Sequence, residues 1–247
     1  MTSAVQTRCA LCPVQSTSLC GALNEETSCA LSRIAHRIRV PAGRVIYGGA
    51  VQQPRSFGII VSGVIKLVIT KPDGRQQIVG LQFPSDFVGR PLVGNSNLSA
   101  EAATKLDLCC FSGRAFEALM REHPQLEHAL LRRMVEDLDA AREWAFLLGR
   151  TTAQEKVASL LYVIAKQMGK TNRNLATKSD QGFHLPLTRM EMAECLSLRL
   201  ETVCRQFKQL KDQGVIAASG RRNFDVLDVD ELKRRAEYPK GASECMQ

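Results

Sequence analysis

The feature that most constrains this sequence is an abrupt change of periodicity at Pro124. From about Arg37 to Phe116, short apolar runs alternate with turn signals, and Pro-Asp-Gly at 72–74 separates two of these runs. Because Pro presets φ and Gly accepts a positive φ, this tripeptide predicts a β-hairpin. Short strands at regular spacing favour a β-barrel or jelly roll over a parallel sheet.

After Pro124 the apolar residues recur at alternating spacings of three and four, which indicates a long helix with one apolar face. The pattern favours a helix that pairs with a second copy of itself, and an amphipathic helix packed on its own domain is the alternative. The predicted seam consists of Leu131, Met134, Leu138, Ala141, Ala145 and Leu148.

A second helix is predicted from about Ala153 to Gln167. The polar residues 170–182 that follow it are rich in turn formers and are interpreted as an exposed connection. Further on, Thr188 followed three residues later by Glu191 is a capping box, which marks the start of a helix. A short break and another helix, stopped by Gly214, complete a predicted helix-turn-helix.

Basic residues are concentrated around the second helix of this motif. Residues 199–222 carry six basic and two acidic side chains, a local net charge of +4 in a chain of +8. Basic side chains neutralise phosphates, Arg205 can present a fork to guanine, and Glu201 can accept from the cytosine amine. A solvated ion pair between Glu201 and Arg205 is the alternative. That alternative leaves unexplained the capped helix and a predicted β-hairpin wing at 214–226, so double-stranded DNA is the predicted partner.

Nine cysteines form the other unusual feature of the composition. No apolar run approaches the roughly 18 residues that a membrane helix needs, and the N-terminus lacks the apolar core of a secretory signal. A cytoplasmic protein without membrane contact is therefore expected. There, closely spaced cysteines such as Cys9, Cys12 and Cys20 indicate metal or redox chemistry before disulfides. Cys-x-x-Cys alone does not distinguish iron, zinc and thiol redox sites.

Over nearly its full length the sequence resembles the CRP/FNR superfamily of bacterial transcription factors. The resemblance is carried by DFVGRP at 86–91, by residues 139–161 and by LTRMEMAECLSLRLETVCR at 187–205. It implies an α+β fold with four parts: a cysteine-rich iron-sulfur arm (1–30), a jelly-roll β-roll sensor domain like that of cyclic-nucleotide-binding proteins (31–123), a dimerisation helix (124–150), and a winged helix-turn-helix (151–247).

The second helix of the reader is similar to the FNR pattern E-x-x-S-R. By that resemblance Glu201 and Arg205 read the core of a half-site, usually TTGAT in an inverted repeat. Cys204 stands where Ser is usual, Ser197 where Gly is common, and Arg199 where Thr is common, so that Arg199 could touch a phosphate instead of capping. The expected DNA-contacting residues are Glu201, Cys204, Arg205, Lys208, Arg199 and Arg221.

The resemblance also bears on the signal. Cyclic-nucleotide members carry a Glu where this chain has Arg90, and an Arg-Ser pair where it has residues 99–101, so no cyclic nucleotide is expected. Instead, the arm resembles the FnrL/FnrN-like branch, which implies a [4Fe-4S] cluster. The implied cofactor and metal ligands are Cys9, Cys12, Cys20 and Cys109, with Cys110 as the fallback for the fourth.

The implied function is that of an oxygen-responsive transcription regulator, mainly an activator of anaerobic or microaerobic genes. It binds DNA as a homodimer while the cluster is intact, and RNA polymerase is an expected partner. The alternative is a cluster-free, FixK-like regulator modulated by oxidation of Cys204. A metal-dependent enzyme is disfavoured, because the four histidines are dispersed and no nucleophile with a base is visible.

Overall fold

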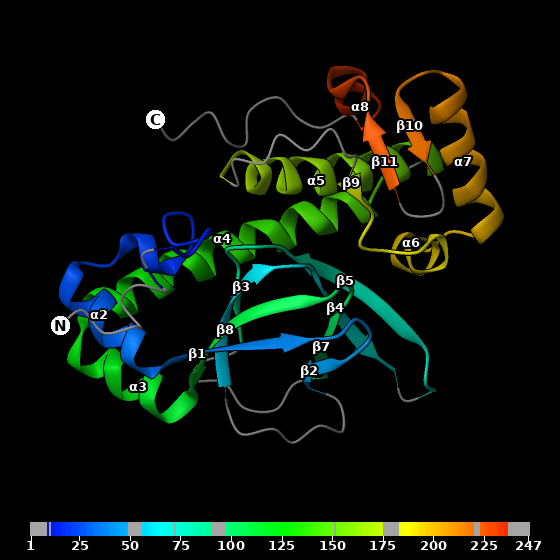
Figure 1. Ribbon diagram of the computed structural model, residues 1–247. Coiled ribbons are helices and arrows are strands. Elements are labelled where there is room, and N and C mark those ends of the chain that lie inside the picture. The colour runs from blue at the N-terminus through cyan, green and yellow to red at the C-terminus, as the bar shows by residue number, and fades with distance from the viewer. Residues whose placement is uncertain are drawn as a thin grey trace. The chain divides into compact units, whose positions relative to one another are not determined.

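The computed structural model divides the chain into two compact units, residues 1–142 and 143–247 (Figure 1). The boundary falls within helix α4 (Pro124–Leu148), inside the segment predicted as the dimerisation helix. The structure describes residues 9, 11–48, 56–71, 73–89, 97–150, 152–174, 183–219 and 223–236, without the side chains of 170–174, 183–184, 218–219 and 223.

The first unit contains two four-stranded antiparallel sheets, with strand orders β1-β8-β3-β6 and β2-β7-β4-β5. The predicted hairpin is confirmed, because β4 pairs antiparallel with β5 across the turn that contains Gly74. The sheets together form the predicted β-roll. Their strands are β1 (Ala35–Val40), β2 (Val45–Tyr47), β3 (Ser56–Ser62), β4 (Ile65–Thr70), β5 (Gln76–Gln82), β6 (Phe87–Val88), β7 (Leu98–Ala102) and β8 (Leu106–Ser112).

The consecutive strands β3 and β4 belong to different sheets, and Gly63 makes the turn between them. Gly63 has a φ of 91°, and a Cβ there would lie 2.3 Å from the carbonyl oxygen of Lys105. Only glycine meets both conditions without strain. The strand region ends earlier than the sequence pattern suggested, because Phe116 belongs to helix α3 (Gly113–Glu122). Its helical spacing from Leu119 and Met120 buries all three side chains in one core.

The two faces of β8 enter different apolar cores. Leu106, Leu108 and Cys110 pack between the sheets with residues such as Ile60 and Ala100. Cys109 and Phe111 face the other way and join a core formed with helices and with the N-terminal arm. Successive side chains of a strand point to opposite faces, so this division follows directly from the backbone. Adjacent cysteines are thereby placed in separate environments.

The N-terminal arm packs against this second core. A 3-10 helix η1 (Leu19–Ala22) precedes helix α2 (Glu25–Ile34), which begins where the Asn24 side chain accepts from the Thr27 amide at 2.9 Å. Val14, Leu19 and Leu31 are each at most 4% exposed and contribute to the core. The arm is thus part of the folded first unit.

Helix α4 contributes to the same core as the arm. Leu126, Ala129 and Leu130 are buried there, and Pro124 occupies the first helical position, where its missing amide hydrogen costs nothing. The predicted long helix is confirmed. None of the helices in the described part of the chain combines the length and the apolarity that a membrane crossing requires.

In the second unit, the predicted helix is α5 (Ala153–Asn174), and it buries Val157, Leu160, Leu161 and Ile164 completely. The helix extends beyond Gln167 into the segment interpreted as a connection. Residues 170–174 include no proline or glycine to stop the ladder of backbone hydrogen bonds. The remaining elements are α6 (Arg189–Leu196), α7 (Leu200–Asp212), α8 (Val229–Arg235) and a sheet ordered β10 (Ile216–Ser219), β11 (Asn223–Val226), β9 (Phe183–His184).

Candidate metal centre and nucleic-acid interface

The arm carries three cysteines into the first unit. Its chain folds back through Gly21, where a Cβ would lie 2.5 Å from the carbonyl oxygen of Ser16, so this close approach requires glycine. The amide of Cys12 donates to the carbonyl of Cys9 at 3.1 Å, and the amide of Cys20 donates to the Ser18 hydroxyl at 3.4 Å. These contacts turn the three cysteines toward one region.

Cys109 reaches the same region from β8. It pairs with Arg37 on β1 and with Ile59 on β3. A cavity of about 30 Å³ is lined by the predicted ligands Cys9, Cys12, Cys20 and Cys109, and its apolar wall includes Leu31. Four cysteines from two distant parts of the sequence thus line one cavity.

The other cysteines of this unit are placed differently. Cys110, the fallback ligand, is 7% exposed and packs between the sheets beside Gly58. Cys29 lies on α2 and is not among the residues that line the cavity. The alternation of β8 therefore presents Cys109, and not Cys110, to the arm.

Two of the cavity thiols, Cys20 and Cys109, have raised pKa values. Burial is the main cause that raises the pKa of Cys20 to about 11 and that of Cys109 to about 12, and the neighbouring cysteines raise both further. Arg37 acts in the opposite direction on Cys109. A cysteine binds a metal as its thiolate, so metal binding at this site must release protons. Among the described residues, no three His, Cys, Asp or Glu side chains are grouped closely enough to hold a single metal ion.

The second unit contains the predicted helix-turn-helix. The capping box is formed in both directions, because the Glu191 amide donates to Thr188 Oγ1 at 3.2 Å and the Thr188 amide donates to Glu191 Oε2 at 2.8 Å. Ser197 makes the turn with a φ of 54° and a ψ of 43°, a left-handed conformation that glycine would adopt with less strain. The chain therefore makes this turn without the glycine common in the resembling family.

Helix α7 separates a buried face from an exposed one. Val203, Phe207 and Leu210 are at most 5% exposed, as predicted. The opposite face carries four exposed side chains that the sequence nominated for DNA contact: Glu201, Cys204, Arg205 and Lys208.

Exposed Arg199 occupies the N-cap of α7 and makes no side-chain capping bond there. Helix N-termini favour anions because their amide groups and dipole are positive. Strands β10 and β11 pair antiparallel as the predicted wing, from Ile216 with Val226 to Ser219 with Asn223. Gly220, Arg221 and Arg222, which fall between these two strands in the sequence, lie outside the described residues.

Arg189, the first residue of α6, lies within the helix-turn-helix but was not singled out by the sequence pattern. Its guanidinium lies over the Phe207 ring, 3.3 Å from the ring centroid, and close enough to Cys204 for the two to interact electrostatically. A planar guanidinium stacks well on an aromatic face. The signal in the sequence was a basic residue directly after the Thr188 cap.

Helix α4 leaves part of its apolar surface uncovered. Leu131, Val135 and Leu138 are 61%, 51% and 50% exposed, and we call these three residues the pairing face. Of the other predicted seam residues, Ala141 and Ala145 are exposed and Leu148 is half-buried. Met134 is half-buried against the core that contains the arm, whereas Val135, which the pattern did not single out, is exposed.

Comparison with known proteins agrees with this architecture. The Crp-like helix-turn-helix domain matches residues 155–235 and the cyclic nucleotide-binding domain matches residues 37–123. A probable transcriptional activator of Rhizobium leguminosarum bv. viciae is 44% identical over 227 residues, which are 92% of both chains. The transcriptional activator protein FnrL of Cereibacter sphaeroides is 41% identical over 233 residues, 93% of this chain and 92% of FnrL. This chain belongs to the Crp/Fnr family of transcription regulators.

The structure of FixK2 from Bradyrhizobium japonicum is also similar to this Crp/Fnr regulator, with a TM-score of 0.70 and 25% identity over 81% of this chain and 96% of FixK2. The helix-turn-helix is the DNA-binding part of the regulator.

In the β-roll of this chain, Glu101 forms an ion pair with Lys66 at 2.9 Å, while Arg90 lies outside the described residues. That no cyclic nucleotide binds stays a prediction.

Proposed function

We propose that this Crp/Fnr regulator binds a [4Fe-4S] cluster through Cys9, Cys12, Cys20 and Cys109, and that it activates anaerobic or microaerobic genes in response to oxygen. The observation that carries the proposal is the cavity shared by these four thiols. Four cysteine thiolates are the usual ligand set of such a cluster, and most of the other residues that line the cavity are apolar. When bound, the cluster supplies a centre that oxygen can destroy.

In the proposed function each region of the chain has its own role. The arm and β8 supply the ligands, and each thiol gives up its proton on binding. The pairing face of α4 supplies apolar surface for a second copy of the chain, because leucine and valine side chains in this spacing pack well against their equivalents. Dimerisation places two copies of α7 on successive turns of a duplex, about 34 Å apart.

On DNA, Arg205 and Glu201 read base edges, and Arg199, Lys208 and Arg221 contact phosphates. We propose a TTGAT inverted repeat as the site and RNA polymerase as a partner at activated promoters. The likeness to the transcriptional activator FnrL over almost the whole chain supports a role in activation, and the resemblance of Glu201, Cys204 and Arg205 to E-x-x-S-R supports the site.

The proposal is tested by purifying the protein without oxygen, recording its absorption spectrum and counting iron and sulfide. We expect a broad absorbance that air bleaches, with about four iron and four sulfide atoms per chain. A colourless protein, or one that holds zinc alone, would contradict it.

Two neighbouring cysteines provide a matched pair of variants. Cys109→Ser is expected to lose iron and sulfide, whereas Cys110→Ser is expected to keep them, because Cys110 faces the space between the sheets. The reverse result would reassign the fourth ligand.

A second candidate function rests on Cys204. Its exposed position on the reading face allows peroxide to oxidise the thiol to a sulfenic acid with release of water, which adds bulk at the DNA surface. Relatives named nitrogen fixation regulation protein FixK, such as that of Bradyrhizobium diazoefficiens at 33% identity over 85% of this chain, make a cluster-free regulator the alternative. If Cys204→Ser leaves the peroxide sensitivity of DNA binding unchanged, this alternative fails.

A further inference from the structure

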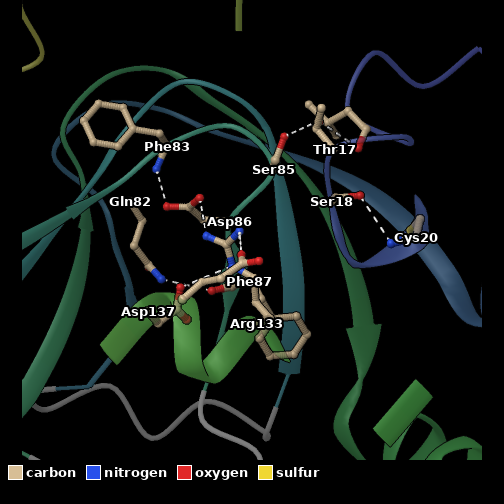
Figure 2. A network of polar contacts seen from close by, with 12 residues as sticks. Thr17, Ser18, Cys20, Gln82, Phe83, Ser85, Asp86, Phe87, Arg133 and Asp137 are labelled. Carbon is tan, nitrogen blue, oxygen red and sulfur yellow. Dashed lines mark hydrogen bonds and ion pairs between the residues drawn. The ribbon is translucent and has the colours of Figure 1, made fainter. Parts of the chain in front are cut away.

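Polar contacts join the cysteine arm to helix α4 through a turn of the β-roll (Figure 2). Thr17, which lies between Cys12 and Cys20 in the arm, places its Oγ1 atom 2.6 Å from Ser85 Oγ. The two residues are far apart in sequence, and Ser85 belongs to the turn between β5 and β6. A hydroxyl pair of this length is a short hydrogen bond.

The turn that receives this contact is held firmly. Ser85 has a φ of 84°, which a residue with a side chain adopts only where its surroundings impose it. Its amide donates to the carbonyl of Ile60 on β3 at 2.8 Å. Next to it, Asp86 accepts from the Phe83 amide through Oδ2 at 2.8 Å. A displacement of Ser85 therefore displaces the Asp86 carboxylate.

The free oxygen of that carboxylate meets helix α4. Asp86 Oδ1 accepts from the Arg133 guanidinium at 2.6 Å, and the two side chains are only 19% and 17% exposed. Arg133 also contacts Glu136 at 3.0 Å and Asp137 at 3.2 Å. One cation is thus shared by three carboxylates, and Arg133 points from α4 toward the turn in Figure 2.

Arg133 lies in the stretch of α4 that faces both the arm and the exterior. Leu130 and Met134 pack into the core with the arm residues Val14 and Leu19. Within the same turns of α4, the pairing face is exposed. A small rotation or shift of α4 against the arm would change how the pairing face is presented.

We propose that Arg133 is the positioning residue that transmits the state of the cysteine arm to the pairing face, through Asp86 and the contact of Ser85 with Thr17. This inference rests on the proposed function and names the route by which its cluster site regulates dimerisation. Occupation of the cavity orders the arm, the arm holds the Ser85–Asp86 turn through Thr17, and the turn holds α4 through Arg133. Coupling of this kind is a free energy shared by the two sites.

The test compares the dimer dissociation constant of cluster-loaded protein with that of chelator-stripped protein, both measured without oxygen by sedimentation. For the unmodified chain we expect the two constants to differ by about tenfold or more. Arg133→Met should bring their ratio to within about twofold of one, and Arg133→Lys should restore part of it. Arg142→Met is the control, because Arg142 lies on the same helix and forms an ion pair with exposed Asp139 at 3.0 Å.

If Arg133→Met keeps the full ratio, the inference is overturned while the proposed function stands. If the unmodified chain binds no iron and sulfide, the proposed function fails, and a double-mutant cycle in the metal-free protein then decides about the route. Thr17→Val removes one exposed hydroxyl with little change in volume, so this variant is expected to fold. Effects of Thr17→Val and Arg133→Met on dimerisation that differ from additivity by about threefold or more support the route, and additive effects overturn it.

Discussion

The two units place their chemically important side chains in opposite environments. In the first, Cys20, Cys109 and Asp86 are largely enclosed, and burial raises the pKa of each. In the second unit, the face of α7 that carries Glu201, Cys204, Arg205 and Lys208 is exposed. The opposite face is buried and anchors the helix. A site that must hold a group away from water is built inside a core, whereas a site that must meet a phosphate backbone is built on a surface. The contrast shows that residue type alone does not set the role of a cysteine.

The largest effect on stability is expected from a substitution in the wall of the cysteine-lined cavity. Leu31 is 2% exposed and lines the cavity, so Leu31→Ala should lower the free energy of unfolding by about 2–5 kcal/mol. It should also lower the pKa of Cys20, since burial is the main cause of its rise. Alkylation of Cys20 at pH 8 should then accelerate by about tenfold for each unit of pKa lost.

Leu232→Ala is the matched control for this prediction. Leu232 is completely buried in the second unit, so its truncation should destabilise that unit without changing the alkylation of Cys20. Equal acceleration in both variants would show that general unfolding, and not burial in the cavity, governs the reactivity of the thiol.

A smaller effect is expected on the exposed surface. Arg205→Ala should weaken specific DNA binding by about 1–3 kcal/mol and relax the preference at one base pair. Lys208→Ala should weaken binding almost equally for all sequences and reduce the slope of log K against log salt by about one. Fluorescence anisotropy with matched and mismatched duplexes at several salt concentrations separates the two. Identical losses on both duplexes for Arg205→Ala would contradict its role as a reader.

The smallest effect concerns the pH dependence of stability in the first unit. Burial and nearby Asp86 raise the pKa of Asp137 to about 6, although Arg133 opposes them. Because this folded-state pKa exceeds the unfolded value, the carboxyl contributes stability that is fully present below about pH 4 and is lost as the pH rises through about 6. Asp137→Asn should flatten this part of the profile in urea unfolding. Asp139→Asn, at a side chain on the same helix that is 63% exposed, is the control for loss of one carboxylate.

Local signals predicted the secondary structure where a few adjacent residues decide it. The capping box of Thr188 and Glu191, the hairpin turn at Gly74 and the long helix after Pro124 all formed as expected. The short strand β9 was missed, because Phe183–His184 becomes a strand only by pairing with β11. A pattern of two residues carries too little information to predict such a pairing. The helix α8 was missed although Asp228 caps its first turn locally.

The sequence by itself determined which residue types were available, their periodicity and the resemblance that nominated the four ligands and the readers. The resemblance favoured Cys109 over Cys110 as the fourth ligand, and only the tertiary structure placed the two on opposite faces of β8, Cys109 toward the arm and Cys110 between the sheets. It likewise turned Met134 toward the core and left Val135 exposed. It also joined Thr17, Ser85, Asp86 and Arg133, since contacts between distant segments depend on how the whole chain packs.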